Sequence, residues 1–350
     1  MAISKLTNTP TGIVIYGMNA PDSQRSTVRW GILGCGSIAH NFVQALPLVP
    51  TADLVAVASR SNAAGFSGQY RDTYPDLTVY QDYAELAGDP AVDAVYIATT
   101  HNFHFAHAML CLEQGKHVLC EKPITINADQ LVRLRDTARR HDCFLMEALW
   151  TRFLPGIRQL TELLQQRVIG DVRLLQANFG IQVADDPQHR LLNPQLAGGA
   201  LLDLGIYPLN FARIVYGREL ISARSVAEIG PTGVDEVSAY LLQFAGGGTA
   251  VLSSSCRVAT PHTALLYGTT GSIEVEDFFH PSVIHVRTGS HTHTYQVGYP
   301  ATGFQYEIQE ASHCILSGLA ESRIMPIEES LQIISLMDQF RADWGLSYPD

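Results

Sequence analysis

Between residues 28 and 148 the chain alternates short apolar runs with amphipathic stretches, and this alternation restricts the possible folds more than any other feature. Strands are expected at Arg29–Leu33, Leu54–Ser59, Ala94–Ala98, His117–Cys120 and Phe144–Ala148, with a weaker one at Thr78–Tyr80. Amphipathic stretches that begin near Ser37, Ala63, Asn102 and Ala128 are expected to form the helices between them. Strands that alternate with helices in this way predict an α/β fold with a doubly wound parallel sheet.

After Trp150 the pattern changes. A helix is expected at Gly156–Arg167, a long strand at Val172–Val183, an irregular polar loop at Ala184–Gln195 and a second helix at Leu209–Tyr216. The remaining elements are expected to be strands at Ala223–Ile229, Val237–Phe244, Thr249–Cys256, Thr263–Tyr267, Ser272–Val275, Val283–Val286 and His293–Val297, and helices at Phe304–Ser317 and Ile327–Asp343. Consecutive strands with short glycine-containing turns predict an α+β domain with an open, mainly antiparallel sheet.

These patterns divide the chain into an extension at residues 1–27, a first domain at 28–150 and a second at 151–350. With 350 residues, of which 46% are apolar, the chain can bury two cores. A net charge of −11 argues against a nucleic-acid partner, and no run reaches the roughly 18 apolar residues of a membrane span. Six scattered cysteines without a C-x-x-C pair, and no secretory signal, predict a cytoplasmic protein.

A glycine loop follows the first expected strand and begins the first expected helix. Its sequence is Gly34-Cys35-Gly36-Ser37-Ile38-Ala39. The two glycines allow a tight turn and a close approach of the backbone to a pyrophosphate, which the helix N-terminus attracts. The motif predicts a dinucleotide-binding loop made by Gly34, Gly36, Ser37 and Ile38, and it makes residues 28–150 the cofactor domain.

The second expected strand ends in Ser59-Arg60-Ser61, where NAD-binding proteins usually have an acidic residue for the ribose 2′-hydroxyl. A guanidinium with neighbouring hydroxyls suits a 2′-phosphate. We therefore expect Ser59 and Arg60 to bind NADP(H), with NAD as a second possible cofactor. The alternative for Arg60 is a solvated surface arginine.

A buried strand also leads into Glu121-Lys122-Pro123. The carboxyl ends of parallel strands form the ligand crevice, so Lys122 should project towards whatever binds beside the cofactor. Pro123 restricts Lys122 to an extended backbone. A surface lysine is the alternative.

Several motifs resemble those of the glucose-fructose oxidoreductase/inositol dehydrogenase/MocA-like family. The glycine loop, Thr100-His101-Asn102-Phe103-His104 and Glu121-Lys122-Pro123 carry this resemblance. The segments 147–153 (EALWTRF) and 198–208 (GGALLDLGIYP) are similar to the dimeric dihydrodiol dehydrogenase and NADP-linked D-xylose dehydrogenase branch. The resemblance extends from about residue 28 to residue 350 and implies a Rossmann cofactor domain and a homodimer formed through the open sheet.

The resemblance also implies site residues. Cofactor contacts are expected at Thr100, Asn102, His104, Glu121 and Lys122. The usual Thr-Pro-Asn of the family is Thr100-His101-Asn102 here, so His101 is not included. Lys122 would lie near the nicotinamide and the reacting hydroxyl, Tyr207 would occupy the acid/base position, and Asp203 would be the acidic partner.

Tyr207 is chemically suited to that role. Hydride transfer from a carbinol requires removal of the hydroxyl proton, and a phenolate can accept it if the tyrosine pKa falls from about 10 towards the working pH. The ammonium of Lys122 is expected to stabilise this phenolate. A hydrogen-bonded tyrosine at a domain boundary is the structural alternative. The spacing of Asp203 and Tyr207 suits one face of a continuous helix, although Pro208 leaves their direct contact open.

Trp150, Arg152 and Phe179 are expected to contact the substrate, by resemblance. Core packing of Trp150 and an interdomain ion pair of Arg152 are the alternatives. The histidines at 101, 104 and 107 lack the i,i+4 spacing and the third ligand of a zinc site, so no metal is predicted.

The sequence thus predicts an NADP-dependent oxidoreductase that transfers hydride between nicotinamide and a hydroxyl or carbonyl carbon of a sugar or cyclic polyol. D-xylose 1-dehydrogenase and trans-dihydrodiol dehydrogenase chemistry are the expected types. The alternative is a non-catalytic regulator that senses a dinucleotide on the same fold.

Overall fold

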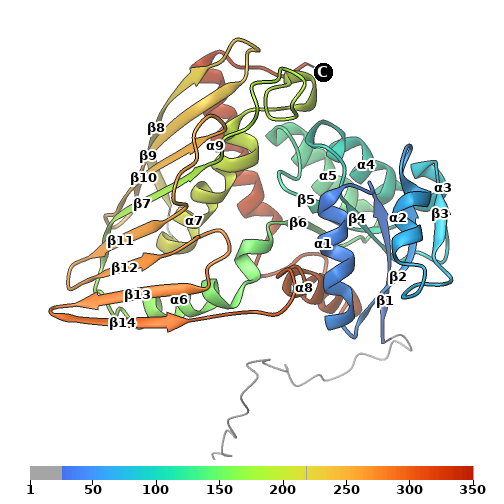
Figure 1. Ribbon diagram of the computed structural model, residues 1–350, viewed down its shortest axis with the longest axis horizontal. Helices are drawn as coiled ribbons and strands as arrows, with labels where there is room; N and C mark the ends of the chain where they lie inside the picture. Colours follow the sequence, from blue (N-terminus) through green and yellow to red (C-terminus); the bar gives the residue numbers. More distant parts are fainter. Residues whose placement is uncertain (1–25, 218, 350) are drawn as a thin grey trace, which may run out of the picture.

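The computed structural model describes residues 26–217 and 219–349, and it contains two sheets with helices packed on them (Figure 1). Most of the expected extension at residues 1–27 lies outside the described residues. The first sheet is parallel, with the order β3-β2-β1-β4-β5-β6. Its strands are β1 (Val28–Leu33), β2 (Ala52–Ala58), β3 (Thr78–Tyr80), β4 (Ala94–Ile97), β5 (His117–Glu121) and β6 (Leu145–Ala148). The predicted doubly wound sheet is confirmed.

The helices between these strands begin close to their expected positions. They are α1 (Ser37–Ala45), α2 (Ala63–Gln69), α3 (Tyr83–Gly88), α4 (His101–Glu113) and α5 (Ala128–Arg140). The short helix α3 was not predicted; the side chain of Asp82 caps it by accepting a hydrogen bond from the amide of Ala84. In the core, Phe42 of α1 stacks on Tyr96 of β4 with ring centroids 4.1 Å apart.

The second sheet has eight strands in the order β14-β13-β12-β11-β7-β10-β9-β8. Its strands are β7 (Val172–Gly180), β8 (Leu220–Ile229), β9 (Asp235–Phe244), β10 (Thr249–Ser255), β11 (Ala264–Gly268), β12 (Ser272–Val275), β13 (Val283–Thr288) and β14 (His291–Gln296). Neighbouring strands are antiparallel, apart from the parallel pair of β7 and β10. The predicted open, mainly antiparallel sheet is confirmed.

Helices α6 (Pro155–Gln165), α7 (Ile206–Tyr216) and α9 (Ile327–Trp344) lie on the side of this sheet that faces the first one (Figure 1). The helical segment around α7 begins earlier than the predicted Leu209, because a π-helical turn, η4 (Leu201–Gly205), precedes it. Pro208, which cannot donate an N–H within the helix, lies just after this π-helical turn.

Helix α8 (Gln305–Leu316) returns to the first sheet, although it follows the second sheet in sequence. It packs against β1, β2 and α1, and the indole of Trp30 donates a hydrogen bond to the hydroxyl of Ser312 (3.2 Å). Helix α9 contacts α5 and β6 as well as α7 and β8, so it lies between the sheets (Figure 1). The expected boundary after Trp150 therefore separates the two sheets but not the helices that cover them.

Within the described residues, no helix has the length and apolar character needed to cross a bilayer. The six cysteines are buried and free.

Candidate active site

The glycine loop has the form that a dinucleotide pyrophosphate requires. Gly34 has a φ of +94°, and a Cβ there would lie 2.7 Å from the carbonyl oxygen of Ala98, so a side chain would be both strained and crowded. Gly36 is the N-cap of α1 and supplies no capping side chain. The first amides of α1, beginning at Ser37 and Ile38, are therefore available to an anionic group.

Arg60 follows β2 and lies against two aromatic rings. Its guanidinium carbon is 5.3 Å from the ring centroid of Phe103 and 5.9 Å from that of Tyr83. The open depression around it is lined by Arg60, Val79, Gln81, Asp82, Tyr83 and Glu85. The end of β2 has no carboxylate, as the sequence indicates, but Asp82 and Glu85 from the β3–α3 region line the same depression as Arg60.

Two of the expected cofactor contacts are buried instead. Ser59 is buried, and its hydroxyl accepts a hydrogen bond from the amide of Asn62 (3.4 Å) within the turn. His104 is fully buried, with ring nitrogens 2.7 Å from the carbonyl oxygen of Pro123 and 3.0 Å from that of Thr99. Burial lowers the pKa of His104 to about 3, so the ring is neutral. In the structure His104 joins the start of α4 to the loop after β5.

Thr100 and Asn102 remain at the entrance of this region. Thr100 is the exposed residue before α4, and its hydroxyl donates to the side-chain oxygen of Asn102 (2.8 Å). Both side chains lie at the carboxyl edge of the parallel sheet, close to the end of β4. The structure leaves them available for a cofactor.

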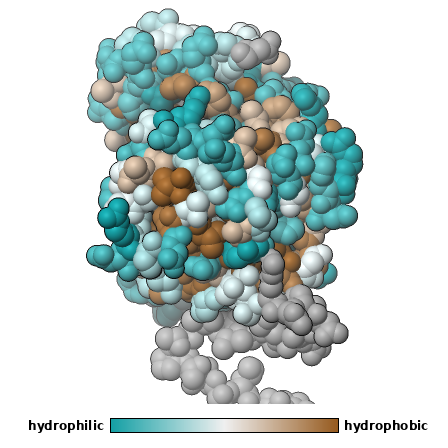
Figure 2. Space-filling model, turned by 90° about the vertical axis from the view of Figure 1, so that its right-hand side faces the viewer, coloured by the Kyte–Doolittle hydropathy of each residue, from teal (hydrophilic) through white to brown (hydrophobic). Residues whose placement is uncertain are grey.

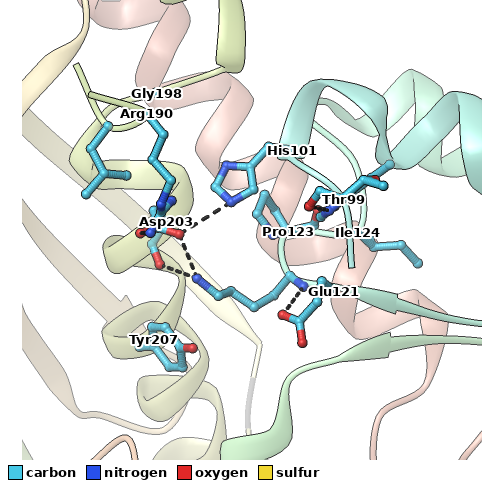
Figure 3. A network of polar contacts seen from close by, with 12 residues as sticks. Thr99, His101, Glu121, Pro123, Ile124, Arg190, Gly198, Asp203 and Tyr207 are labelled. Atoms are coloured by element: carbon cyan, nitrogen blue, oxygen red, sulfur yellow. Dashed lines mark hydrogen bonds and ion pairs between the residues drawn. The ribbon is translucent and has the colours of Figure 1, made fainter. Parts of the chain in front are cut away.

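Lys122 joins the two domains through Asp203 (Figure 3). Lys122 follows β5 and precedes a cis peptide bond to Pro123. Its Nζ donates to the carboxylate Oδ1 of Asp203 (2.8 Å) and to the backbone carbonyl of the same residue (2.9 Å). Asp203 belongs to η4 and its side chain is only 4% exposed. The sequence analysis expects Asp203 to be the acidic partner of the site, and the structure places its carboxylate against Lys122.

Two further side chains converge on Asp203. The Nε2 of His101 lies 3.3 Å from Oδ1, and Nη2 of Arg190 donates to Oδ2 at 2.9 Å (Figure 3). Sequence reasoning missed both. His101 replaces a proline of the family motif and was set aside for that reason. Arg190 lies in a polar loop whose sequence carries no periodic signal.

The charges of this cluster follow from burial and pairing. Burial alone would raise the pKa of Asp203, but Lys122, His101 and Arg190 hold it well below its usual range. Burial lowers the pKa of Lys122, but the charge and hydrogen bond of Asp203, together with the nearby Tyr207 and Glu121, offset this, so that pKa is raised. Burial lowers the pKa of His101 despite the nearby Asp203 carboxylate, so the ring is neutral. The cluster therefore carries two positive charges and one negative charge.

Tyr207 lies one turn after Asp203, on α7, and also adjoins Lys122. The Nζ of Lys122 is 5.0 Å from the centre of the phenol ring, and Trp150 Nε1 donates weakly to the hydroxyl at 3.4 Å. Burial raises the pKa of Tyr207, and the opposing effect of Lys122 is smaller. Lys122 acts in the expected direction, since its charge lowers the pKa of Tyr207, but burial outweighs it and the net pKa is raised.

An aromatic wall surrounds Tyr207. The ring centroid of Phe179 lies 5.1 Å from that of Tyr207, and Phe179 stacks on Phe279 at 4.5 Å. Trp150 stacks on Phe304 at 5.2 Å. The structure thus brings the expected substrate residues Trp150 and Phe179 to Tyr207. Phe279 and Phe304 were missed because they come from distant segments without a recognisable motif.

Arg152, in contrast, binds to α9. Its guanidinium pairs with the carboxylate of Glu329 and donates to the carbonyl oxygen of Ile324 (3.0 Å). The Arg152 side chain is 7% exposed. This ion pair is of the kind that sequence analysis held as the alternative to a substrate contact.

Glu121 points into the protein, away from the expected cofactor contact. Its carboxylate accepts hydrogen bonds from the hydroxyl of Tyr96 and from the amide of Lys122 (3.2 Å). Burial raises the pKa of Glu121 to about 7. Nearby, Glu307 of α8 is fully buried, and neither carboxyl oxygen has a hydrogen-bond partner within the described residues. Burial and the charge of Glu121 hold the pKa of Glu307 well above its usual range, so Glu307 is neutral.

Two family models match this architecture. The model described as "Oxidoreductase family, NAD-binding Rossmann fold" matches residues 28–149, and that described as "GFO/IDH/MocA C-terminal domain" matches residues 157–274. The chain belongs to the GFO/IDH/MocA family. It is an NAD(P)-dependent oxidoreductase that acts on CH–OH groups. Within its described residues, no group of three or more histidine, cysteine or acidic side chains could hold a metal.

Dehydrogenases from vertebrates are similar to this chain over nearly its whole length. The chain is 37% identical over 331 residues to the trans-1,2-dihydrobenzene-1,2-diol dehydrogenase of Xenopus tropicalis, covering 92% of this chain and 99% of the relative. It is 35% identical over 335 residues to the enzyme of the same name from Mus musculus, covering 92% and 98%.

Solved structures of the family share the fold. A 3-ketoreductase from Actinomadura kijaniata, KijD10, in complex with NADP and TDP-benzene, is 29% identical with a TM-score of 0.79, covering 90% of this chain and 97% of the other. The aldose-aldose oxidoreductase of Caulobacter crescentus is 23% identical with a TM-score of 0.81 over the same shares, which supports the fold alone.

Proposed function

We propose that this protein is an NADP-dependent dehydrogenase for a carbinol of a cyclic diol or an aldose, of the trans-dihydrodiol or D-xylose 1-dehydrogenase type. The observation that carries the proposal is the Lys122 ammonium, which Asp203 holds beside Tyr207 and under an aromatic wall. The names of the relatives support this substrate class.

The residues at the carboxyl edge of the first sheet fit a dinucleotide. Gly34 and Gly36 leave room for a pyrophosphate, the uncapped start of α1 offers its amides, and Arg60 would take the 2′-phosphate. When bound, NADP⁺ supplies the hydride acceptor. Asp82 and Glu85 would serve ribose hydroxyls if NAD were bound instead.

Lys122 is placed to bind the reacting oxygen. An ammonium has three N–H donors, and two of those on Lys122 bond to Asp203, which leaves one for a substrate oxygen. The neutral phenol of Tyr207 can donate its proton to a carbonyl oxygen in the reducing direction. In the oxidising direction a phenolate is required, and Lys122 provides the positive charge that favours it.

The aromatic wall favours ring substrates. Phe179 and Trp150 present ring faces and edges beside Tyr207, and such surfaces pack well on the apolar face of a sugar or cyclohexadiene ring. The ring would be held there while its hydroxyl meets Lys122 and Tyr207.

The test is the Tyr207→Phe variant, assayed with NADP⁺ and a panel of aldoses and cyclic diols. Removing a general acid/base should lower kcat by about 10²–10⁴-fold, while NADPH binding measured by fluorescence stays unchanged. Tyr216→Phe is the matched control, since Tyr216 lies on the same helix and its hydroxyl donates to the carbonyl of Thr249 (2.9 Å). Undiminished turnover in Tyr207→Phe would exclude the role of Tyr207. Tight cofactor binding by the unmodified protein, without turnover of any substrate, would favour the regulator.

We further propose that the protein forms a homodimer through the outer face of the second sheet. Val226 of β8, Leu241 of β9, Val251 of β10 and Tyr267 of β11 are exposed large side chains on these strands. Figure 2, which views the side of the first sheet, shows a mostly hydrophilic surface with smaller apolar patches. Contiguous exposed apolar side chains mark interaction surfaces. Light scattering that gives the mass of one chain at assay concentration would contradict the dimer. We also propose that the protein is located in the cytoplasm.

A further inference from the structure

The segment that follows α9, residues 345–349, reaches the loop that carries Arg190. The hydroxyl of Tyr348 donates a hydrogen bond to the carbonyl oxygen of Gly198 (2.5 Å). In Figure 3 Gly198 lies next to Arg190, whose side chain reaches Asp203. A contact at the edge of the fold is thus linked to the charge cluster of the site.

Gly198 is tightly enclosed by the same loop. A Cβ at this position would lie 2.7 Å from the carbonyl oxygen of Arg190 and 2.8 Å from that of Leu191. The amide of Gly198 donates to the carbonyl of Asn193 (3.1 Å), and the amide of Gly199 donates to that of Leu191 (2.8 Å). Because of this close packing, a shift of Gly198 must also move the backbone of Arg190.

The helix before the segment is anchored to the cofactor domain. Arg341 of α9 faces the ring of Tyr348, with its guanidinium carbon 5.0 Å from the ring centroid, and donates to the carbonyl of Ile126 (2.6 Å). Asp338 accepts a hydrogen bond from the amide of Ala128 (2.8 Å), at the start of α5. The end of α9 therefore holds both the segment after Lys122 and, through Tyr348, the loop of Arg190.

Arg190 needs such support. Its side chain is 50% exposed, whereas that of Asp203 is 4% exposed. An ion pair with one exposed partner contributes little by itself, because water competes for the guanidinium and ordering it costs side-chain entropy. Holding the Arg190 backbone in place removes part of that cost.

We propose that Tyr348 is a positioning residue for the substrate site, which keeps Arg190 on Asp203 through Gly198. This inference rests on the proposed function only in taking the Arg190–Asp203 pair as part of that site. It assigns a role to a segment that is distant in sequence from the glycine loop and from the Glu121-Lys122-Pro123 motif. Loss of the hydroxyl should weaken substrate binding more than the chemical step.

The first experiment compares Tyr348→Phe with Ser347→Ala, a control at an exposed neighbouring residue. We expect KM for the sugar or diol to rise about five- to tenfold in Tyr348→Phe, the change that one hydrogen bond makes, with kcat and the Kd of NADPH little changed. In an Arg190→Ala background, Tyr348→Phe should cause no further rise. Equal effects of Tyr348→Phe in both backgrounds would overturn the proposal.

The second experiment is independent of the substrate. Trypsin cleavage after Arg190, followed by the mass of the fragments, reports how firmly the loop is held. We expect Tyr348→Phe to be cut faster at this bond than the unmodified protein and Ser347→Ala. If no substrate is turned over at all, the proposed function fails, while faster cleavage of Tyr348→Phe still supports the role of Tyr348 in holding the loop of Arg190. Equal cleavage rates in the three proteins would refute it.

Discussion

Asp203→Asn is the perturbation that most directly tests the charge cluster. The asparagine has nearly the same shape and keeps an acceptor for Lys122, but it removes the one negative charge of the cluster. The Lys122 ammonium then stays buried, with its side chain 13% exposed, without its counter-charge. We expect the variant to fold less stably and to lose activity. The alkaline limit of kcat should move to lower pH, because burial then lowers the pKa of Lys122 with only Tyr207 and Glu121 opposing it.

The magnitude follows from the geometry. Two unit charges 2.8 Å apart attract each other by about 6 kcal/mol at an effective dielectric constant near 20. Desolvation of both groups offsets part of this, and removing one partner of a buried pair costs about 3–5 kcal/mol in free energy of unfolding. Arg190 adds less than Lys122 because its side chain is half exposed. We therefore expect a loss of about 3–5 kcal/mol at pH 7.

The loss should depend on pH. The pKa of Asp203 is held well below its unfolded value of about 3.9, so its stabilisation is present above that value and disappears as the pH falls through the folded pKa. The pKa of Lys122 is raised, so its contribution is present below about 10.4 and disappears as the pH rises through the folded pKa. The difference in free energy of unfolding between the unmodified protein and Asp203→Asn should be largest between these two pH limits and should shrink in acid.

The assay is urea unfolding of both proteins at pH 7 and at successively lower pH. Asp171→Asn is the control, because Asp171 pairs with Arg167 (2.8 Å) on the surface, with side chains 39% and 67% exposed. It should cost at most about 1 kcal/mol. A loss below 1 kcal/mol in Asp203→Asn at pH 7, or a loss that does not shrink in acid, would refute the reasoning.

Three further predictions concern residues around the site. Arg60→Ala should raise the KM of NADP⁺ about tenfold or more and leave that of NAD⁺ unchanged; an equal change for both cofactors in steady-state kinetics would remove Arg60 from the 2′-phosphate. Glu307→Gln should change the free energy of unfolding by less than about 1 kcal/mol, since the acid is already neutral, and a large fall in Tm would show a charged Glu307. Arg152→Ala should cost about 1–3 kcal/mol through the ion pair with Glu329, with KM unchanged in substrate titrations.

The sequence predicts the parts of this protein that depend on local patterns. The parallel strands, the glycine loop and the ends of β5 and α7 are set by apolar periodicity and by glycine and proline chemistry over a few residues. Lys122 could be singled out because it follows a buried strand in a local motif, and Asp203 and Tyr207 could be singled out through the resemblance to the family. Trp150 and Phe179 could be placed beside them through the resemblance to the family.

The remaining site residues depend on contacts between distant segments. His101 and Arg190 meet only at Asp203, and no local pattern records this meeting. The raised pKa of Tyr207 depends on burial by the aromatic wall, which cannot be read from its neighbours in sequence. The same holds for Arg152, whose partner Glu329 lies on the last helix.

The packing of α8 on the first sheet has a consequence for synthesis of the chain. Trp30 of β1 is fully buried, and its indole bonds to Ser312 of α8. A ribosome must therefore translate almost the whole chain before this face of the first sheet can be covered. Until then, an apolar surface of a nascent domain is exposed, and such surfaces bind chaperones or one another. The cofactor domain can fold completely only after α8, near the C-terminus, has been synthesised. Residues 28–150 produced alone should therefore aggregate.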